Sequence, residues 1–224
     1  MKVVHKLYIL LWKELKTESR AKEVLTSMLV FSLLVVTTFG FALELPRDEV
    51  GKILPGLIWV TLIFAGLLGL NRSFVAEKQN DCLLGLMLCP IDRSLIYFAK
   101  TITNLVLMGI VELVSVPLFF IMFNYPMPQK TGLFLLILAL GTYCFIAVGT
   151  FLSALAAGTR TSEILLPVLL IPLIIPVLLS AVLVTQHALG SSIAGVSLYL
   201  KLLATYAVIF TVLPALLFDY LLEV

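Results

Sequence analysis

Long apolar runs separated by short polar stretches dominate this chain of 224 residues. A helix needs ~20 mostly apolar residues to cross ~30 Å of hydrocarbon, at 1.5 Å per residue. Six stretches meet or approach that length: residues 24–43, 53–70, 101–123, 133–157, 164–185 and 202–218. An open sheet would leave backbone groups unpaired in lipid, so each stretch is predicted to be a transmembrane helix.

The composition agrees with this pattern. Hydrophobic residues make up 61% of the chain and charged residues 12%, about half of the ~25% in an ordinary globular protein. No soluble core of this size could bury so much apolar surface. We therefore expect an all-α integral membrane protein embedded in the lipid bilayer. The net charge of +2 gives no indication of a nucleic-acid partner.

The distribution of Lys and Arg outside the spans predicts the orientation. Eleven of these residues fall on one side: Lys2, Lys6, Lys13, Lys16, Arg20, Lys22, Arg72, Lys78, Arg93, Lys100 and Arg160. Four fall on the other: Arg47, Lys52, Lys130 and Lys201. Both termini are therefore predicted to be cytoplasmic, as an even number of spans requires.

The first 23 residues predict a separate element. Apolar residues recur at three- and four-residue steps: Val3, Val4, Leu7, Tyr8, Leu11, Trp12 and Leu15. Charged residues are assigned largely to the other face: Lys6, Lys13, Glu14, Lys16 and Glu18. This pattern predicts an amphipathic helix in the membrane interface, followed by a six-span domain over residues 24–224. An extension of the first span is the alternative, which the charges over residues 13–23 disfavour.

A second cytoplasmic segment, residues 71–94, is longer than the ~2–8 residues that usually connect bundle helices. It mixes charges with apolar residues. The apolar ones are Phe74, Leu83, Leu84, Leu86, Met87 and Leu88, and the charged ones are Arg72, Glu77, Lys78, Asp81, Asp92 and Arg93. We expect this segment to be a docking loop for a partner protein.

The sequence contains no phosphate-binding loop, zinc-protease motif or nucleophile elbow. We therefore expect no ATP binding by that route, no catalytic residue and no metal site in this chain. The cysteines, Cys82, Cys89 and Cys144, are interpreted as free thiols. His187 lies in the last outer loop, where it could offer an axial ligand to haem, although a lone loop histidine is more often simply solvated.

Glu112 is the one charged residue inside a predicted span. A carboxylate there costs ~2.5–3.5 kcal/mol, so it should face protein or water and not lipid. Two interpretations stay open: a proton or substrate path, or a neutral hydrogen-bonded residue at a helix interface.

The fifth span carries three prolines, Pro167, Pro172 and Pro176. Each removes a backbone donor, which predicts a kinked or partly broken helix and a candidate hinge. Ordinary packing is the alternative. Small residues four apart, in 149–157 and 65–69, predict close helix approach within the subunit or between copies.

Some of these features together resemble a known family. The amphipathic helix, the six spans, the long first cytoplasmic loop and the missing ATP site resemble an ABC-2-type permease. The stretch from Pro55-Gly-Leu-Ile-Trp-Val60 through Pro90 is similar to the CcmB family of cytochrome c-type biogenesis proteins, also called haem exporter protein B. Residues 171–178 resemble the family's L-P-L-x-I-P-L-L element. The chain departs from the family's acid-rich loop at Asn71, Ala76, Asn80 and Leu84.

This resemblance implies a non-enzymatic, homodimeric permease subunit in the bacterial inner membrane. Its expected partners are an ATPase like CcmA and proteins like CcmC, CcmD and CcmE. ATP and haem would be handled by those partners, with no cofactor bound directly by this chain. The docking anchors would be Phe74, Leu83, Leu86, Met87 and Leu88, with Arg72, Glu77 and Arg93 as rim charges.

Two other functions stay open. One is an ABC-2-type permease that exports a different hydrophobic substrate. The other is an intramembrane enzyme or proton-coupled carrier that uses Glu112.

Overall fold

The structure, a computed structural model, describes residues 3–43, 46–79, 93–157 and 162–221. These residues form helices and no strand. The helices are α1 (Val3–Ala21), α2 (Glu23–Ala42), α3 (Arg47–Gln79), α5 (Arg93–Met122), α6 (Thr131–Ala157), α7 (Ser162–Ala188) and α8 (Val196–Leu221).

Six of the described helices, α2, α3 and α5 to α8, are long and apolar enough to cross a membrane. Each contains one of the six stretches predicted from hydropathy, nearly in full. The predicted fold class, an all-α membrane protein with six spanning helices after an N-terminal helix, is therefore confirmed. The helices continue beyond the apolar stretches at most ends, because helix formation tolerates polar residues once the chain leaves the hydrocarbon.

Helix α3 differs most from its predicted span. It continues through residues 71–79, so this part of the expected loop is helical, and α5 already begins at Arg93. Residues 71–79 contain neither Gly nor Pro and end in Ala76-Glu77-Lys78-Gln79, four residues of high helix propensity. The segment between predicted spans two and three is thus partly an extension of the spanning helix itself.

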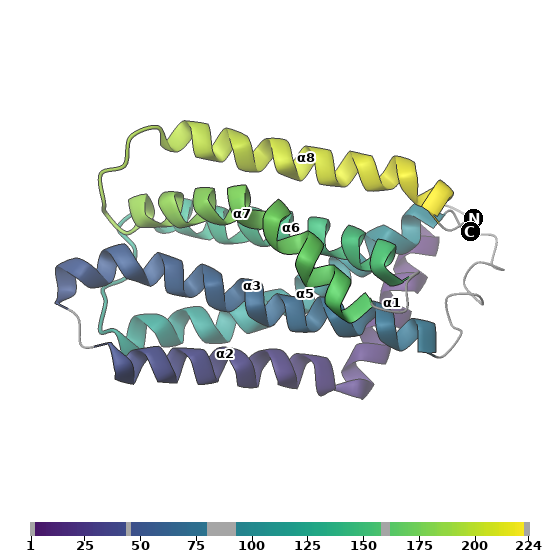
Figure 1. The fold of residues 1–224 in the computed structure, drawn as a ribbon, viewed down its shortest axis with the longest axis horizontal. Coiled ribbons are helices and arrows are strands. Elements are labelled where there is room, and N and C mark those ends of the chain that lie inside the picture. The colour runs from purple at the N-terminus through teal and green to yellow at the C-terminus, as the bar shows by residue number, and fades with distance from the viewer. Residues whose placement is uncertain (1–2, 44–45, 80–92, 158–161, 222–224) are drawn as a thin grey trace.

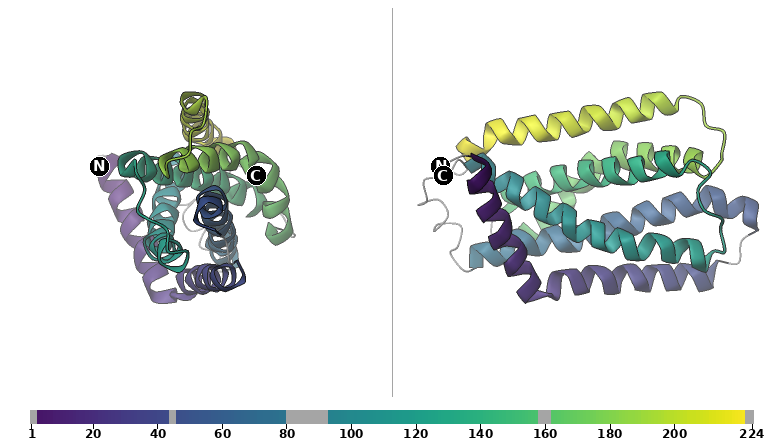
Figure 2. Two further views of the ribbon diagram at one scale, coloured as in Figure 1. Left: turned by 90° about the vertical axis from the view of Figure 1, so that its left-hand side faces the viewer. Right: turned by 180° about the vertical axis from the view of Figure 1, so that it is seen from behind.

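The spanning helices form an elongated bundle, with both termini at the same end (Figure 1). We call this end the base. Helix α1 lies across the bundle there, steeply inclined to α2 (Figure 2). The chain turns between the two helices at Lys22, whose φ of 47° and ψ of −16° are left-handed.

Helix α8 runs along the edge of the bundle (Figure 1). Polar contacts attach it to its neighbours: the Tyr97 hydroxyl donates to the Phe210 carbonyl at 2.8 Å, and the Cys144 thiol donates to the Leu203 carbonyl at 3.2 Å. Interhelical hydrogen bonds of this kind stabilise helix pairs in lipid, where burial of apolar surface adds little.

The closest packing in the core lies between α3 and α6. A Cβ built on Gly149 would lie 2.3 Å from Leu70 Cδ1, and one on Gly141 would lie 2.3 Å from the Trp59 ring. The Ser153 hydroxyl also donates to the Leu70 carbonyl at 3.1 Å. The small-residue stripe of the fourth span therefore allows close approach within the subunit.

Candidate functional site

Helix α1 is fixed to the start of α5 at the base. Leu10 of α1 and Leu95 and Ala99 of α5 form a separate buried cluster, with Leu7 and Leu11 packed against it. The opposite side of α1 leaves Tyr8 65% and Trp12 56% exposed. The helix thus has one apolar side against α5 and a second, largely exposed aromatic side, where the Lys16 ammonium lies 4.2 Å from the centroid of the Trp12 ring.

A buried ion pair adds to this contact. Lys100 Nζ lies 3.5 Å from Glu14 Oε2, and the two residues are 1% and 7% exposed. Lys13 Nζ lies 3.1 Å from the other carboxylate oxygen. The sequence places Glu14 among the charged residues that lie largely on the face opposite the apolar ones, whereas the structure buries it beside α5. The Lys100 ammonium, buried at the start of α5, provides the opposite charge that allows Glu14 to face the protein.

The predicted docking residues fall into two groups. Arg72, Phe74 and Glu77 belong to the last turns of α3, and Arg93 is the first residue of α5. Leu83, Leu86, Met87 and Leu88 lie outside the described residues. The ends of α3 and α5 that flank the segment both lie at the base (Figure 1).

Glu112 of α5 lies beside Thr142 of α6. The Thr142 hydroxyl donates to Glu112 Oε1 in a short hydrogen bond. Glu112 also lines a cavity of about 350 Å³ between the two helices. Both earlier interpretations therefore keep support, because the carboxyl group is hydrogen-bonded at a helix interface and also faces a space large enough for a ligand.

Apart from Glu112 and Thr131, the wall of the cavity is apolar. Its lining includes Val116, Pro117, Phe120, Phe134 and Leu138. The Phe120 and Phe134 rings pack edge to face, with centroids 5.7 Å apart. Leu113 and Leu135, which also line it, are 77% and 60% exposed. The cavity therefore opens sideways, on the surface that an embedded bundle turns toward lipid.

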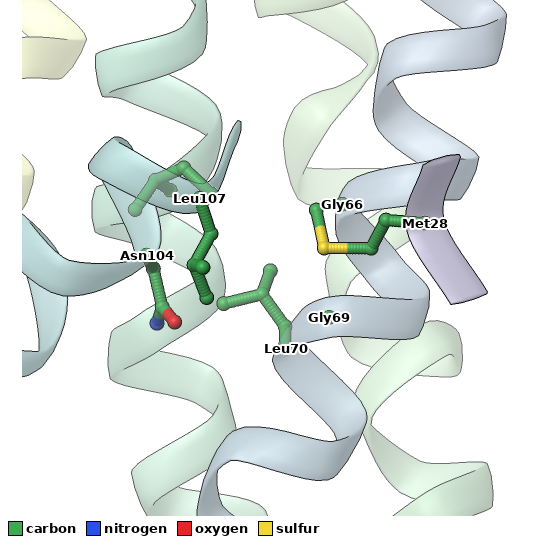
Figure 3. Close-up of a pocket in the computed structure, with 7 residues that line it drawn as sticks. Met28, Gly66, Gly69, Leu70, Asn104 and Leu107 are labelled. Atoms are coloured by element: carbon green, nitrogen blue, oxygen red, sulfur yellow. The ribbon is translucent and has the colours of Figure 1, made fainter. Parts of the chain in front are cut away.

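A second, much smaller cavity lies where α2, α3, α5 and α6 meet (Figure 3). Its volume is about 10 Å³, no more than the space of a single water molecule. Met28 and Leu70 border it, and the amide of Asn104, which also lines it, donates to the Thr150 hydroxyl at 3.2 Å. This cavity is too small for a ligand and marks imperfect packing.

The three prolines of the fifth span lie in α7, which is helical without interruption from Ser162 to Ala188. Of the two predicted outcomes, a kinked or a partly broken helix, the break does not occur. The ribbon of α7 bends along its length, in the half nearer the base (Figure 1). Pro167, Pro172 and Pro176 remain candidates for a hinge.

His187 lies at the end of the bundle opposite the base. Its Nδ1 lies 3.0 Å from the Ser191 carbonyl oxygen, which requires a donating N–H. Its Nε2 lies 2.6 Å from Lys130 Nζ and accepts that hydrogen bond. His187 is thus held between the loops that follow α5 and α7. Among the residues that the structure describes, no three His, Cys, Asp or Glu side chains gather in a group that could hold a metal ion.

The sequence did not indicate the partners of these residues. Glu14 and Lys100 are 86 positions apart, and Glu112 and Thr142 are 30 apart. For Glu112 and Thr142, the presence of one polar residue in each of two spans could have indicated a contact. Nothing in the local sequence specified which helices become neighbours.

Comparison with known proteins gives one family. A sequence profile described as "CcmB protein" matches residues 5–219. A protein named "Heme exporter protein B" from Rhodobacter capsulatus is 31% identical over 185 residues, which cover 82% of this chain and 84% of that protein. Its namesake from Pseudomonas aeruginosa is 29% identical over 187 residues, covering 84% and 82%. The Paracoccus denitrificans namesake is 28% identical over 170 residues, covering 76% and 78%.

Proposed function

The chain belongs to the CcmB family, and from this membership we propose that it is the permease subunit of an ABC transporter complex for cytochrome c maturation. The profile match over nearly the whole chain carries the proposal. The relatives' shared name, haem exporter protein B, supports haem as the cargo of the complex. The six apolar helices support a multi-pass membrane protein, and the location that we propose is the bacterial inner membrane.

In this proposal a separate ATPase like CcmA binds at the base, which faces the cytoplasm. Two copies of the chain would serve two ATPase subunits. Hydrolysis would drive delivery of haem, or release of the haem-loaded chaperone like CcmE from proteins like CcmC and CcmD, at the outer face. The ATPase would bind the segment between α3 and α5, so a displacement there would move the ends of both helices. Helix α1 would move with α5, because the Leu10 cluster and the Glu14–Lys100 pair fix the two helices together.

Co-purification tests the proposal directly. The chain is expressed with its candidate ATPase, purified through a tag on the chain, and assayed for ATP hydrolysis. We expect a stoichiometric complex that hydrolyses ATP. A folded chain that retains no ATPase would overturn the proposal.

The docking segment is tested by substitution. We expect Phe74→Asp and Leu86→Asp to abolish co-purification, because a carboxylate in place of an apolar anchor would be desolvated without a partner. Phe41→Asp is a matched control, since Phe41 is 81% exposed at the opposite end of the bundle. A complex that survives both substitutions would place the ATPase elsewhere.

The hinge role is tested in α7. We expect Pro172→Ala combined with Pro176→Ala to reduce cytochrome c maturation severalfold, because the helix regains two backbone donors and resists bending. Pro214→Ala in α8 is the control and should leave maturation unchanged. Normal maturation with a correctly inserted double variant would show that these prolines only pack.

The cavity beside Glu112 supports a second candidate, an ABC-2-type permease for another hydrophobic substrate. In that case, deletion of the gene would leave cytochrome c maturation intact. A carrier that uses Glu112 would lose activity in Glu112→Gln while assembling normally.

A further inference from the structure

The cavity between α5 and α6 has the size and the wall of a ligand site. Its volume of about 350 Å³ falls within the ~300–1,000 Å³ of small-molecule pockets. Such pockets are mostly apolar with a few polar groups that orient the ligand. Glu112 and Thr142 form such a polar group here, since Thr142 fixes the carboxyl group through Oε1.

The second carboxyl oxygen remains available. Glu112 Oε2 has no hydrogen-bond partner among the described residues, and it is not among the fully buried unpaired atoms. No described Lys, Arg or His pairs with Glu112. A carboxylate at this depth without a cation is costly, so a ligand that supplies a positive charge and a hydrogen-bond donor would be favoured over an uncharged one.

The position of the cavity defines the rest of the ligand. Glu112 lies ten residues before the end of α5 at Met122, about 15 Å along the helix, so it is deep in the hydrocarbon. The exposed rim residues Leu113 and Leu135 are apolar. The rim also reaches the α5–α6 connection, where Met127 is 77% exposed. A molecule that reaches Glu112, from lipid or from this end of the bundle, must therefore carry an apolar body.

Two small residues, Gly109 and Ala139, leave room for the cavity. A Cβ built on Gly109, which lines the cavity, would meet no atom within 4 Å. Ala139 lines the opposite wall from α6. A larger side chain at position 109 would therefore begin in open space beside the cavity.

We propose that this cavity binds a lipophilic amine, with its nitrogen on Glu112 Oε2 and its apolar chain against Val116, Phe120 and Leu138. This site goes beyond the proposed transport function and depends only on the chain being embedded in lipid. It can therefore succeed or fail whether or not the ATPase binds.

Matched ligands test the proposal on the full chain in lipid nanodiscs. Decylamine and decanol are titrated, and the thermal stabilisation that each gives is converted to an apparent Kd. In Glu112→Gln we expect decylamine to bind about tenfold more weakly or worse, because a charge-assisted hydrogen bond is lost. Decanol should bind alike to both proteins. An amine affinity that is unchanged in Glu112→Gln would overturn the proposal.

Filling the cavity gives an independent test. Gly109→Leu should abolish stabilisation by both ligands. Gly132→Leu is the control, because a Cβ there also meets nothing within 4 Å and Gly132 does not line the cavity. Unchanged amine binding in Gly109→Leu would place the ligand elsewhere.

Other occupants give different results, and each would contradict the proposal. If Gly109→Leu weakened the binding of decanol and decylamine equally and Glu112→Gln weakened neither, the natural occupant would be a lipid acyl chain. A dimer that Gly109→Leu dissociates would identify a second copy of the chain.

Substitutions at Thr142 test whether its hydrogen bond orients the Glu112 carboxyl group for the amine or only supports the fold. Thr142→Ser keeps the donor and should keep the preference for the amine, whereas Thr142→Val should lower it severalfold with little change in decanol affinity. Loss of the preference in Thr142→Ser as well would show that the hydrogen bond to Oε1 does not orient the carboxyl group.

Discussion

The buried Glu14–Lys100 pair joins α1 to α5 at the base. Removing one charge leaves the other buried, which typically costs ~3–5 kcal/mol, whereas replacing both with apolar residues is often neutral. We therefore expect Glu14→Leu to lower the free energy of unfolding by up to about 3 kcal/mol. Lys100→Met should cost less, because Lys13 Nζ stays 3.1 Å from the Glu14 carboxylate. The double variant should lie close to the wild type. Denaturant unfolding of the purified chain in detergent measures all three.

Lys201→Met is the control for this cycle. Lys201 is exposed on α8, so its loss should cost less than ~0.5 kcal/mol. Additive losses in the double variant would show that Glu14 and Lys100 contribute separately and that their 3.5 Å contact carries no coupling.

At this scale the sequence predicted residue types better than partners. It located Glu112 inside a span and predicted a hydrogen-bonded interface as one of two roles, but it could not supply Thr142. It assigned Glu14 to the polar face of α1, because a helical pattern read from the sequence groups charged residues together and cannot show which of them has a buried partner. Only the packing of α1 on α5 shows that Lys100 provides a buried partner.

At the scale of elements, the close contact of α3 and α6 depends on Gly149. We expect Gly149→Ala to lower stability by about 1–3 kcal/mol, because its Cβ would overlap Leu70 Cδ1 in a packed core. In a Leu70→Ala background the same substitution should cost much less, since the overlap disappears. A melting series of the two single variants and the double variant measures this, and equal costs in both backgrounds would contradict the contact.

The elements themselves could largely be predicted. The six apolar stretches specified six helices, because lipid admits little else. Hydropathy could not define where helices end outside the hydrocarbon, which is why the continuation of α3 through Gln79 was missed. The three prolines indicated a bend in α7, but they could not show that the helix would remain unbroken, since neighbouring groups in a bundle can compensate for a lost donor.

At the scale of the whole molecule, the structure places both termini and α1 at one end and the α7–α8 connection at the other (Figure 1). The order of helices along the chain and their short connections require this arrangement of an even number of spans. The bundle alone does not specify which end faces the cytoplasm. That choice depends on charge, with eleven Lys and Arg residues assigned to the base side and four to the other.

Cysteine labelling tests this orientation. In a variant that lacks Cys82, Cys89 and Cys144, single cysteines are introduced by Ser192→Cys, between α7 and α8, and by His5→Cys in α1, since both positions are exposed. A membrane-impermeant maleimide should label position 192 in spheroplasts of a bacterial host, and position 5 only after permeabilisation. The two variants control for each other. Labelling of position 192 shows that the reagent is active on intact spheroplasts, and labelling of position 5 after permeabilisation shows that the membrane, and not the protein, had shielded that thiol. The reverse pattern would place the base outside, where an ATPase could not reach its nucleotide, and would contradict the transporter proposal at its starting point.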